Sequence, residues 1–225
     1  MYKLKKVFIS RELSDDSIFL QRLNTAGYEV HGETLLTFSP TPFDAIPDSE
    51  WLFFYSQKGV QFFFEQYLKN GDTTPFPYKC AAFGPATAAA IRAFEVTPYF
   101  IGTGKAESTA KYFGERVGND HVCFVRAKNS RRSVQVILKE KINIRELIVY
   151  NNEYKRDFSL PHFDILVFTS PMNARAYFDQ HEFLKDQVVI AIGETTASVL
   201  RELDIKCIVS KMPSEEGLAD CCLMV

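Results

Sequence analysis

The chain alternates short apolar runs with longer stretches in which apolar residues recur every three or four positions. The short runs have the length of buried strands, and the three-to-four spacing is typical of helices with one buried face. The predicted strands cover residues 6–10, 28–31, 51–55, 80–83, 98–101, 121–125, 146–150, 164–168, 188–192 and 206–209. The predicted helices cover residues 14–26, 58–69, 86–94, 106–117, 130–140, 172–182, 195–203 and 214–222. Strands that are apolar on both faces and alternate with helices indicate parallel sheets covered on both sides.

The same strand-and-helix unit occurs twice. Residues 82–94 and 191–203 align at an offset of 109 with five of 13 positions identical. Residues 52–56 pair with 166–170 at an offset of 114, and residues 7–11 pair more weakly with 122–126. Ten predicted strands in two sets therefore indicate an α/β protein with two small, doubly wound domains of about five strands each.

Two divisions into domains agree with this repeat. The simpler one is a single cut near residue 118. The other uses two connectors, the proline-rich residues 37–47 and the polar residues 151–161, so that the middle of the chain forms one domain and both ends together form the other. The pattern alone leaves both divisions open.

Composition and charge narrow the classes of partner. The 225 residues suffice for one large domain or two of about 100 residues each. Twenty-six basic and 28 acidic residues leave a net charge of −2, which argues against a nucleic-acid partner or a polybasic membrane anchor. The apolar runs are far shorter than the ~20 residues of a membrane helix, and too few apolar residues follow the basic N-terminus for a signal peptide.

Motifs for nucleotides, metals and serine hydrolases do not occur. Residues 102–105 (Gly-Thr-Gly-Lys) lack the first glycine and the final hydroxyl residue of a phosphate-binding loop, and neither GxGxxG nor GxSxG occurs. The five cysteines form no CxxC pair and the four histidines have no metal-ligand spacing. We therefore expect no metal site, and free thiols of the kind that cytosolic proteins carry.

Four junctions between a predicted strand and the next helix offer groups that bind anions. They lie at residues 56–59, 84–87, 170–173 and 193–196. Each combines the unpaired backbone N–H groups of a helix start with a Ser or Thr hydroxyl, at the strand ends where open parallel sheets bind ligands. Helix capping alone explains any single junction. Four of them in a duplicated chain favour a cleft with carboxylate or phosphate sites on both walls.

Three further side chains are candidates for this cleft. Arg11 ends the first predicted strand and Arg131 opens a predicted helix, so both are suited to bind a carboxylate through the guanidinium group. For Arg131, a solvated position at the helix start is an equal alternative. Tyr150 lies where a predicted strand meets the second connector, and its hydroxyl is a potential proton donor. From the residues alone, packing is the favoured role for Tyr150.

Seven segments, in their order and spacing over nearly the whole chain, resemble the uroporphyrinogen-III synthase family. They are residues 8–11 (FISR), 54–60 (FYSQKGV), 83–88 (FGPATA), 147–150 (LIVY), 168–171 (FTSP), 192–197 (IGETTA) and 213–218 (PSEEGL). No single segment is specific to the family, whereas their order and spacing together are.

The resemblance implies two flavodoxin-like domains joined by a two-stranded connector, with residues 1–36 plus 155–225 forming an outer domain and residues 37–154 an inserted one. It also implies a cytoplasmic, monomeric lyase of tetrapyrrole (heme) biosynthesis without cofactor or metal. The substrate would be hydroxymethylbilane, a linear tetrapyrrole with eight carboxylates that hydroxymethylbilane synthase supplies. The enzyme would close the ring with inversion of ring D and loss of water, giving uroporphyrinogen III.

The resemblance also suggests roles for individual residues. Tyr150 matches the family's tyrosine at the domain connector, and we expect it to donate a proton to the leaving hydroxyl group. We assign the substrate carboxylates to residues at the helix starts and to two arginines: Arg11, Ser56, Gly84, Thr87, Arg131, Ser170, Gly193, Thr195 and Thr196. The chain departs from the family at Asn152, where a threonine is common, and matches it loosely at residues 58–59 and 172–173.

A non-catalytic, two-lobed binding protein for a small anion is the alternative. Such a protein would use the same cleft without needing Tyr150. In either case a net charge of −2 gives little long-range attraction for a polyanion. Binding must therefore rely on local groups such as helix starts and a few arginines.

Overall fold

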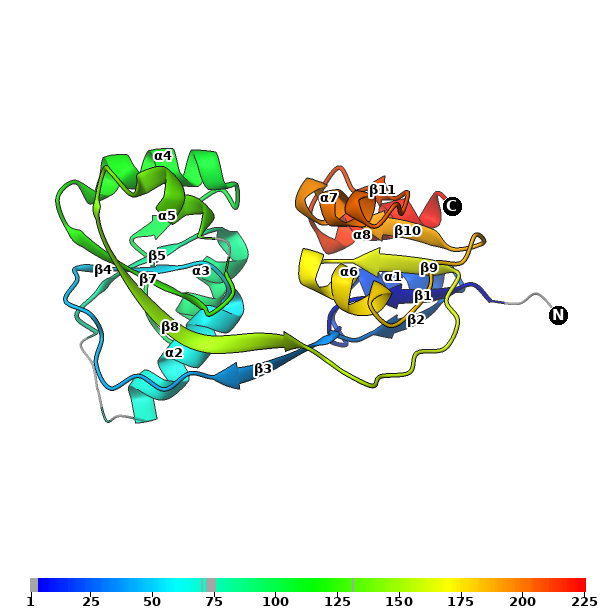
Figure 1. The fold of residues 1–225 in the computed structure, drawn as a ribbon, viewed down its shortest axis with the longest axis horizontal. Helices are drawn as coiled ribbons and strands as arrows, with labels where there is room; N and C mark the ends of the chain where they lie inside the picture. Colours follow the sequence, from blue (N-terminus) through cyan, green and yellow to red (C-terminus); the bar gives the residue numbers. More distant parts are fainter. Residues whose placement is uncertain (1–3, 70, 72–75, 131) are drawn as a thin grey trace. The chain divides into compact units, whose positions relative to one another are not determined.

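The computed structural model describes residues 4–69, 71, 76–130 and 132–225 (Figure 1). Its strands are β1 (Lys6–Ile9), β2 (Glu29–Gly32), β3 (Leu36–Pro40), β4 (Trp51–Phe54), β5 (Lys79–Ala82), β6 (Phe100–Ile101), β7 (His121–Ala127), β8 (Asn143–Tyr154), β9 (Ile165–Phe168), β10 (Val188–Ala191) and β11 (Ile208–Val209). Its helices are α1 (Ile18–Thr25), α2 (Gln57–Lys69), α3 (Pro85–Arg92), α4 (Ala106–Val117), α5 (Ser133–Leu138), α6 (Pro171–Phe178), α7 (Glu194–Glu202) and α8 (Glu215–Leu223).

The contacts between residues divide the chain into two compact units. Unit 1 comprises Met1–Thr37 and Glu153–Val225, and unit 2 comprises Phe38–Asn152. Each unit contains a mainly parallel sheet with helices between consecutive strands, so the predicted α/β class is confirmed.

Every strand and helix that the hydrophobic pattern predicted is present, with small shifts at the ends. The largest shifts are four residues, at the ends of β8 and α6 and at the start of α1, which was predicted from residue 14 and begins at Ile18. Ser17 determines this start, because its hydroxyl accepts a hydrogen bond from the Leu20 N–H and caps the first turn.

The hydrophobic pattern did not predict one strand. Residues 37–47 were predicted as an extended connector, yet β3 occupies the edge of the second sheet beside β8. Two backbone hydrogen bonds of 2.9 Å flank the pair, from the Lys155 N–H to the Leu35 oxygen and from the Thr41 N–H to the Val149 oxygen. The strand has no apolar run, because most of its residues are exposed, and an edge strand tolerates the terminal Pro40.

The strands of the two units have the same order across the sheet, but the chain runs through that order from a different starting strand in each unit. The sheet of unit 1 is ordered β2-β1-β9-β10-β11, which is the flavodoxin-like order 2-1-3-4-5. The core of the sheet of unit 2 is ordered β8-β7-β4-β5-β6. Matching β9–β11 with β4–β6, and β1–β2 with β7–β8, superimposes the two orders. All three internal sequence similarities follow this matching. In the common order, the chain enters unit 1 at its first strand, β1, and enters unit 2 two strands later, at β4.

In unit 1, helices pack on both faces of the sheet. Phe19 of α1 and Leu218 of α8 pack against Val7, Ile9 and neighbouring strand residues on one face. On the other face, Tyr177 of α6 contacts Phe8 and Phe168, with ring centroids 5.8 and 5.5 Å apart. The central strands are buried on both sides, which explains their uninterrupted apolar runs.

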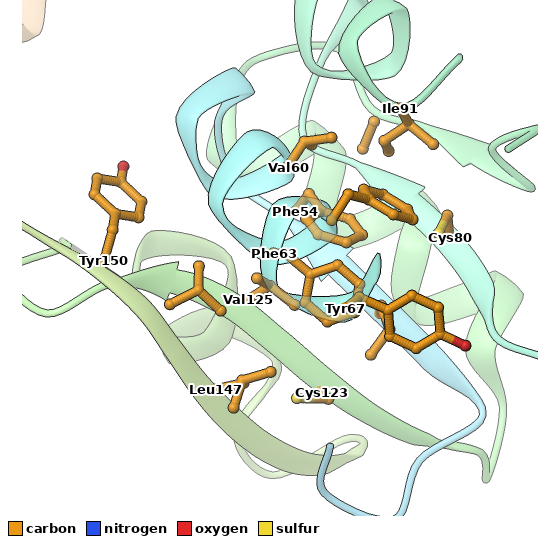
Figure 2. Packing of buried hydrophobic residues seen from close by; sticks show 14 of the residues in the cluster. Phe54, Val60, Phe63, Tyr67, Cys80, Ile91, Cys123, Val125, Leu147 and Tyr150 are labelled. Carbon is orange, nitrogen blue, oxygen red and sulfur yellow. The ribbon is translucent and has the colours of Figure 1, made fainter. Parts of the chain in front are cut away.

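Unit 2 has the same layered arrangement (Figure 1), and many of its core residues are aromatic. Helices α4 and α5 cover one face of the sheet, while α2 and α3 cover the other. Figure 2 shows Phe54, Phe63 and Tyr67 gathered in the apolar cluster on the face that α2 and α3 cover, with Tyr150 of β8 at its margin. The hydroxyl oxygen of Tyr150 is directed away from Phe63 and Tyr67 in this view.

Candidate functional site

Tyr150 and Ser56 form a hydrogen-bonded pair at the start of α2. The Tyr150 hydroxyl lies 3.2 Å from the Ser56 Oγ, and either oxygen can be the donor. Ser56 also accepts a hydrogen bond of 3.0 Å from the Gly59 N–H and so caps the helix. Tyr150 is 7% exposed, and its ring stacks on that of Phe62 with centroids 5.2 Å apart. A buried ring with one anchored hydroxyl is held in a defined position.

Gly59 leaves the space that this pair needs. A Cβ atom at residue 59 would lie 3.3 Å from the Ser56 Oγ and 3.9 Å from the Tyr150 Cε1. The first distance is shorter than most natural Cβ contacts, so a side chain at residue 59 would crowd the Ser56 hydroxyl, whereas the second distance is an ordinary contact. The sequence match at residues 58–59 was loose, yet the glycine there has a steric role beside Tyr150.

The backbone of Tyr150 is held by a turn that a buried arginine organises. The Lys128 N–H donates to the Tyr150 oxygen at 2.9 Å, directly after a bulge between Arg126 and Ala127. The Arg126 guanidinium is 2% exposed and donates to the Ala127 and Lys128 oxygens at 2.8 and 3.0 Å, and to Glu146 at 2.6 Å. Arg126 was not predicted as a site residue, although a charged residue within the apolar run 122–127 was a usable signal.

Burial sets the acidity of the phenol. Removal from water raises the pKa of Tyr150 above the ordinary value of 10.0, while the hydrogen bond to Ser56 acts in the opposite direction. The hydroxyl therefore keeps its proton throughout the neutral range, as a proton donor requires.

We expect the titration of Tyr150 to follow this raised pKa. Because the fold disfavours the tyrosinate, Tyr150 contributes stability that is complete below the unfolded pKa of 10.0 and is lost as the pH rises through the higher folded pKa. The tyrosinate absorbance of the wild type minus that of Tyr150→Phe should give a single ionisation with a midpoint above pH 10. A midpoint at or below pH 10 would contradict the buried, protonated phenol.

The start of α3 lies next to the start of α2 in unit 2. The Gln57 side-chain amide donates to the Ala86 oxygen at 3.4 Å. Gly84 caps α3 without a side chain, and a Cβ there would lie 3.1 Å from the Gly104 Cα, so the junction requires a small residue. Pro85 occupies the first helical position, where its missing N–H costs nothing, and Thr87 is buried in the first turn.

The start of α7 is the corresponding junction of unit 1. Thr196 is buried and its N–H already donates to the Gly193 oxygen at 3.1 Å, whereas Thr195 is exposed. A Cβ at Gly193 would meet nothing within 4 Å. Of the two threonines assigned to this junction, Thr195 is therefore the one with an accessible side chain.

Ser170 caps α6, the counterpart of α2 in unit 1. Its Oγ accepts hydrogen bonds from the Asn173 N–H at 3.2 Å and from the Asn173 side-chain amide at 2.9 Å. The preceding Thr169 is tied to the end of β1, since its N–H donates to the Ser10 Oγ at 2.9 Å and its hydroxyl to the Ser10 oxygen at 3.0 Å. The ends of β1 and β9 therefore meet at this junction.

Of the two predicted arginines, the structure describes the surroundings of Arg11 alone. Arg11 follows β1 and its guanidinium lies 3.7 Å from Glu215 at the start of α8, with both side chains partly exposed. Glu215 is also bound to α1, because it accepts hydrogen bonds from the Ser17 hydroxyl and the Phe19 N–H. Arg11 thus already has an internal carboxylate partner. Arg131 lies outside the described residues.

Within each unit, the predicted groups gather where parallel strands end and helices begin. Unit 2 brings together Ser56, Tyr150 and the start of α3, while unit 1 holds Ser170, the start of α7 and Arg11 at its strand ends. Such an arrangement can bind anionic groups at helix starts and place a protonated phenol beside one of them.

Comparison with known proteins gives a consistent result. Residues 19–220 match the family model described as "Uroporphyrinogen-III synthase HemD". A protein of Archaeoglobus fulgidus named "Putative uroporphyrinogen-III synthase" is 27% identical over 226 residues, covering 93% of each chain.

Two solved structures share the fold. The uroporphyrinogen-III synthetase from Helicobacter pylori has a TM-score of 0.74 at 23% identity and covers 99% of each chain. A mutant uroporphyrinogen III synthase from the extremely thermophilic bacterium Thermus thermophilus has a TM-score of 0.60 at 15% identity, covering 97% of this chain and 98% of its own. At these identities the likeness concerns the architecture of the chain.

Proposed function

Because the chain belongs to the uroporphyrinogen-III synthase family and is thus a cyclising lyase, we propose that its substrate is hydroxymethylbilane and that Tyr150 is its proton donor. The observation that carries the proposal is the pair formed by the Tyr150 and Ser56 hydroxyl groups, 3.2 Å apart at a helix start. The family implies a substrate with eight carboxylates and a hydroxymethyl group whose hydroxyl must leave as water while its carbon stays to close the ring.

The proposed first step is the loss of that water. When Ser56 donates its proton to the Tyr150 oxygen, the phenol proton is directed toward the substrate and can bond to the departing hydroxyl oxygen. The stack on Phe62 and the bond from the Lys128 N–H hold the ring and the backbone in place. The pyrrole nitrogen lone pair stabilises the resulting cation, so the protein needs no covalent nucleophile.

The proposed second task is conformational. The enzyme must hold the cation so that the substituted carbon of ring D is attacked, because unassisted closure occurs without inversion. We propose that the helix starts at Ser56, Gly84–Thr87, Ser170 and Gly193–Thr196 bind substrate carboxylates. The Arg11–Glu215 pair supports a weaker role for Arg11, since a substrate carboxylate would compete with Glu215.

The domain bounds, the oligomeric state, the cellular location and the source of the substrate are also proposals. We propose that unit 1 corresponds to an outer domain of residues 1–36 plus 155–225, and unit 2 to an inserted domain of residues 37–154. A monomeric state, a cytoplasmic location and supply of the substrate by hydroxymethylbilane synthase stay predictions from the family. Within the described part of the chain, no helix combines the length and apolar character needed to cross a bilayer.

The isomer of the product tests the activity. With hydroxymethylbilane as substrate, we expect the wild-type protein to give uroporphyrinogen III, measured by separating the oxidised porphyrin isomers. A reaction without protein should give the type I isomer. Type I product alone in the presence of the protein would overturn the proposed function and favour a non-catalytic binding protein.

A further inference from the structure

The two units differ at one equivalent position beside the capping serine. At the repeat offset of 114, Ser56 corresponds to Ser170 and Gly59 to Asn173. In unit 2 the glycine leaves room for the Tyr150 hydroxyl to reach the serine. In unit 1 the Asn173 side-chain amide donates a 2.9 Å hydrogen bond to the Ser170 hydroxyl oxygen. Asn173 thus takes in unit 1 the hydrogen-bonding place that Tyr150 has in unit 2.

The orientation of the Asn173 amide is determined by its surroundings. Its Oδ1 accepts a 2.7 Å hydrogen bond from the Leu35 backbone N–H and lies 3.4 Å from the Thr34 hydroxyl. A backbone N–H can only donate, so the oxygen of the amide must face Leu35 and the nitrogen must face Ser170. Asn173 is 5% exposed, which makes reorientation costly, because a flipped amide would place two donors against each other.

This orientation limits what the Ser170 hydroxyl can do. Its oxygen accepts from two N–H groups of Asn173, one from the backbone and one from the side chain. A hydroxyl has two acceptor positions and one proton, so both acceptor positions are filled and only the proton remains available. Ser170 can therefore donate to a further partner but cannot accept from one, which suits an anionic oxygen.

We propose that Asn173 is a positioning residue that makes the Ser170 hydroxyl an obligate hydrogen-bond donor to a carboxylate of the substrate. The proposal rests on the proposed function for the identity of that carboxylate. Asn173 does not touch the substrate in this scheme. It acts through Ser170, whose hydroxyl can then bind a hydrogen-bond acceptor of the substrate but not a donor. Unit 2 lacks this selection, because Gly59 has no side chain.

The substitution Asn173→Asp tests the polarity directly. The aspartate has nearly the same shape and can still accept from the Leu35 N–H, but its second oxygen accepts the Ser170 proton instead of donating to the serine. We expect KM for hydroxymethylbilane to rise about tenfold with kcat within twofold, because a hydrogen bond to a charged group is lost. Asn173→Gly, which copies the residue of unit 2, should raise KM less than the aspartate and is the second variant if the aspartate does not fold.

A double mutant separates positioning from a general structural effect. If Asn173 acts through Ser170, Ser170→Ala alone and the Ser170→Ala/Asn173→Asp double mutant should have the same KM within about twofold. Multiplied effects on KM, a fall in kcat at unchanged KM, or a wild-type KM for Asn173→Asp would each overturn the proposal. Thermal unfolding of each variant shows whether the fold is retained.

Binding of uroporphyrin III, the oxidised octacarboxylate product, makes the outcome independent of turnover. We expect its Kd to rise about tenfold in Asn173→Asp. Weakened binding by a protein whose wild type yields no type III isomer would overturn the proposed function while supporting the role of Asn173. A wild type that forms the type III isomer, together with unchanged Kd and KM in the variant, would overturn only the role of Asn173.

Discussion

Tyr150→Phe should lower kcat for hydroxymethylbilane by about 10²-fold or more, while the Kd for uroporphyrin III changes by less than about threefold. The variant keeps the ring that stacks on Phe62 and removes only the hydroxyl beside Ser56. General acid catalysis by one positioned group contributes about 10²–10⁴-fold, so its loss falls mainly on the chemical step. Steady-state turnover and porphyrin fluorescence titration measure the two quantities.

Tyr28→Phe is the matched control for Tyr150→Phe. The Tyr28 hydroxyl makes a single long hydrogen bond of 3.5 Å, to the Cys222 oxygen, and Tyr28 packs at the edge of the core of unit 1. Its removal should leave kcat unchanged. Unchanged kcat in Tyr150→Phe would remove the phenol from the mechanism, and an equal loss of kcat and affinity would assign it to binding.

Phe63→Ala should lower the free energy of unfolding by about 3–5 kcal/mol. Phe63 is 0% exposed at the centre of unit 2, with ring centroids 5.4 Å from Phe54 and 5.6 Å from Phe43. Removing the ring leaves a cavity in a core that cannot collapse freely. This loss is a large part of the 5–15 kcal/mol by which proteins are stable.

Trp51 allows the effect of Phe63→Ala to be followed in unit 2. It is the only tryptophan of the chain, is buried in unit 2, and donates a 2.9 Å hydrogen bond to Asp120. Urea unfolding monitored by its fluorescence should show a lower midpoint for Phe63→Ala. Leu68→Ala, in the same helix but at a position 58% exposed, should change stability by no more than about 0.5 kcal/mol. Equal effects of the two substitutions would contradict this account of the core.

The elements were predictable because their causes are local. The fully buried strand 51–54 is an apolar run, and α4 ends at Val117 just before Gly118, which has a φ of 61°. The edge strand β3 was missed because a strand with most of its side chains exposed carries no apolar run. Its pairing with β8 depends on residues more than 100 positions away in the chain.

The site was predictable as residue types and junctions, and less so as contacts. The helix starts at Gly84, Ser170 and Gly193 were recognisable from a strand followed by a capping or turn residue. The residues alone favoured packing for Tyr150, and its phenol is indeed buried, but they did not reveal its bond to Ser56. The role of Asn173 was not predicted because Leu35, which fixes its amide, is 138 residues away in the chain.

The sequence by itself determined the layers, the duplication and the types of group at the strand ends, since periodicity and capping act over a few residues. Tertiary structure decided which of these groups meet. The Ser56–Tyr150 pair and the Leu35–Asn173 bond join residues 94 and 138 positions apart, and the pairing of β4 with β7 in the permuted sheet joins Trp51 to Val122. Hydrogen bonds of buried side chains are short-ranged and directional, so they depend on the packing of whole elements. No local pattern in the chain encodes that packing.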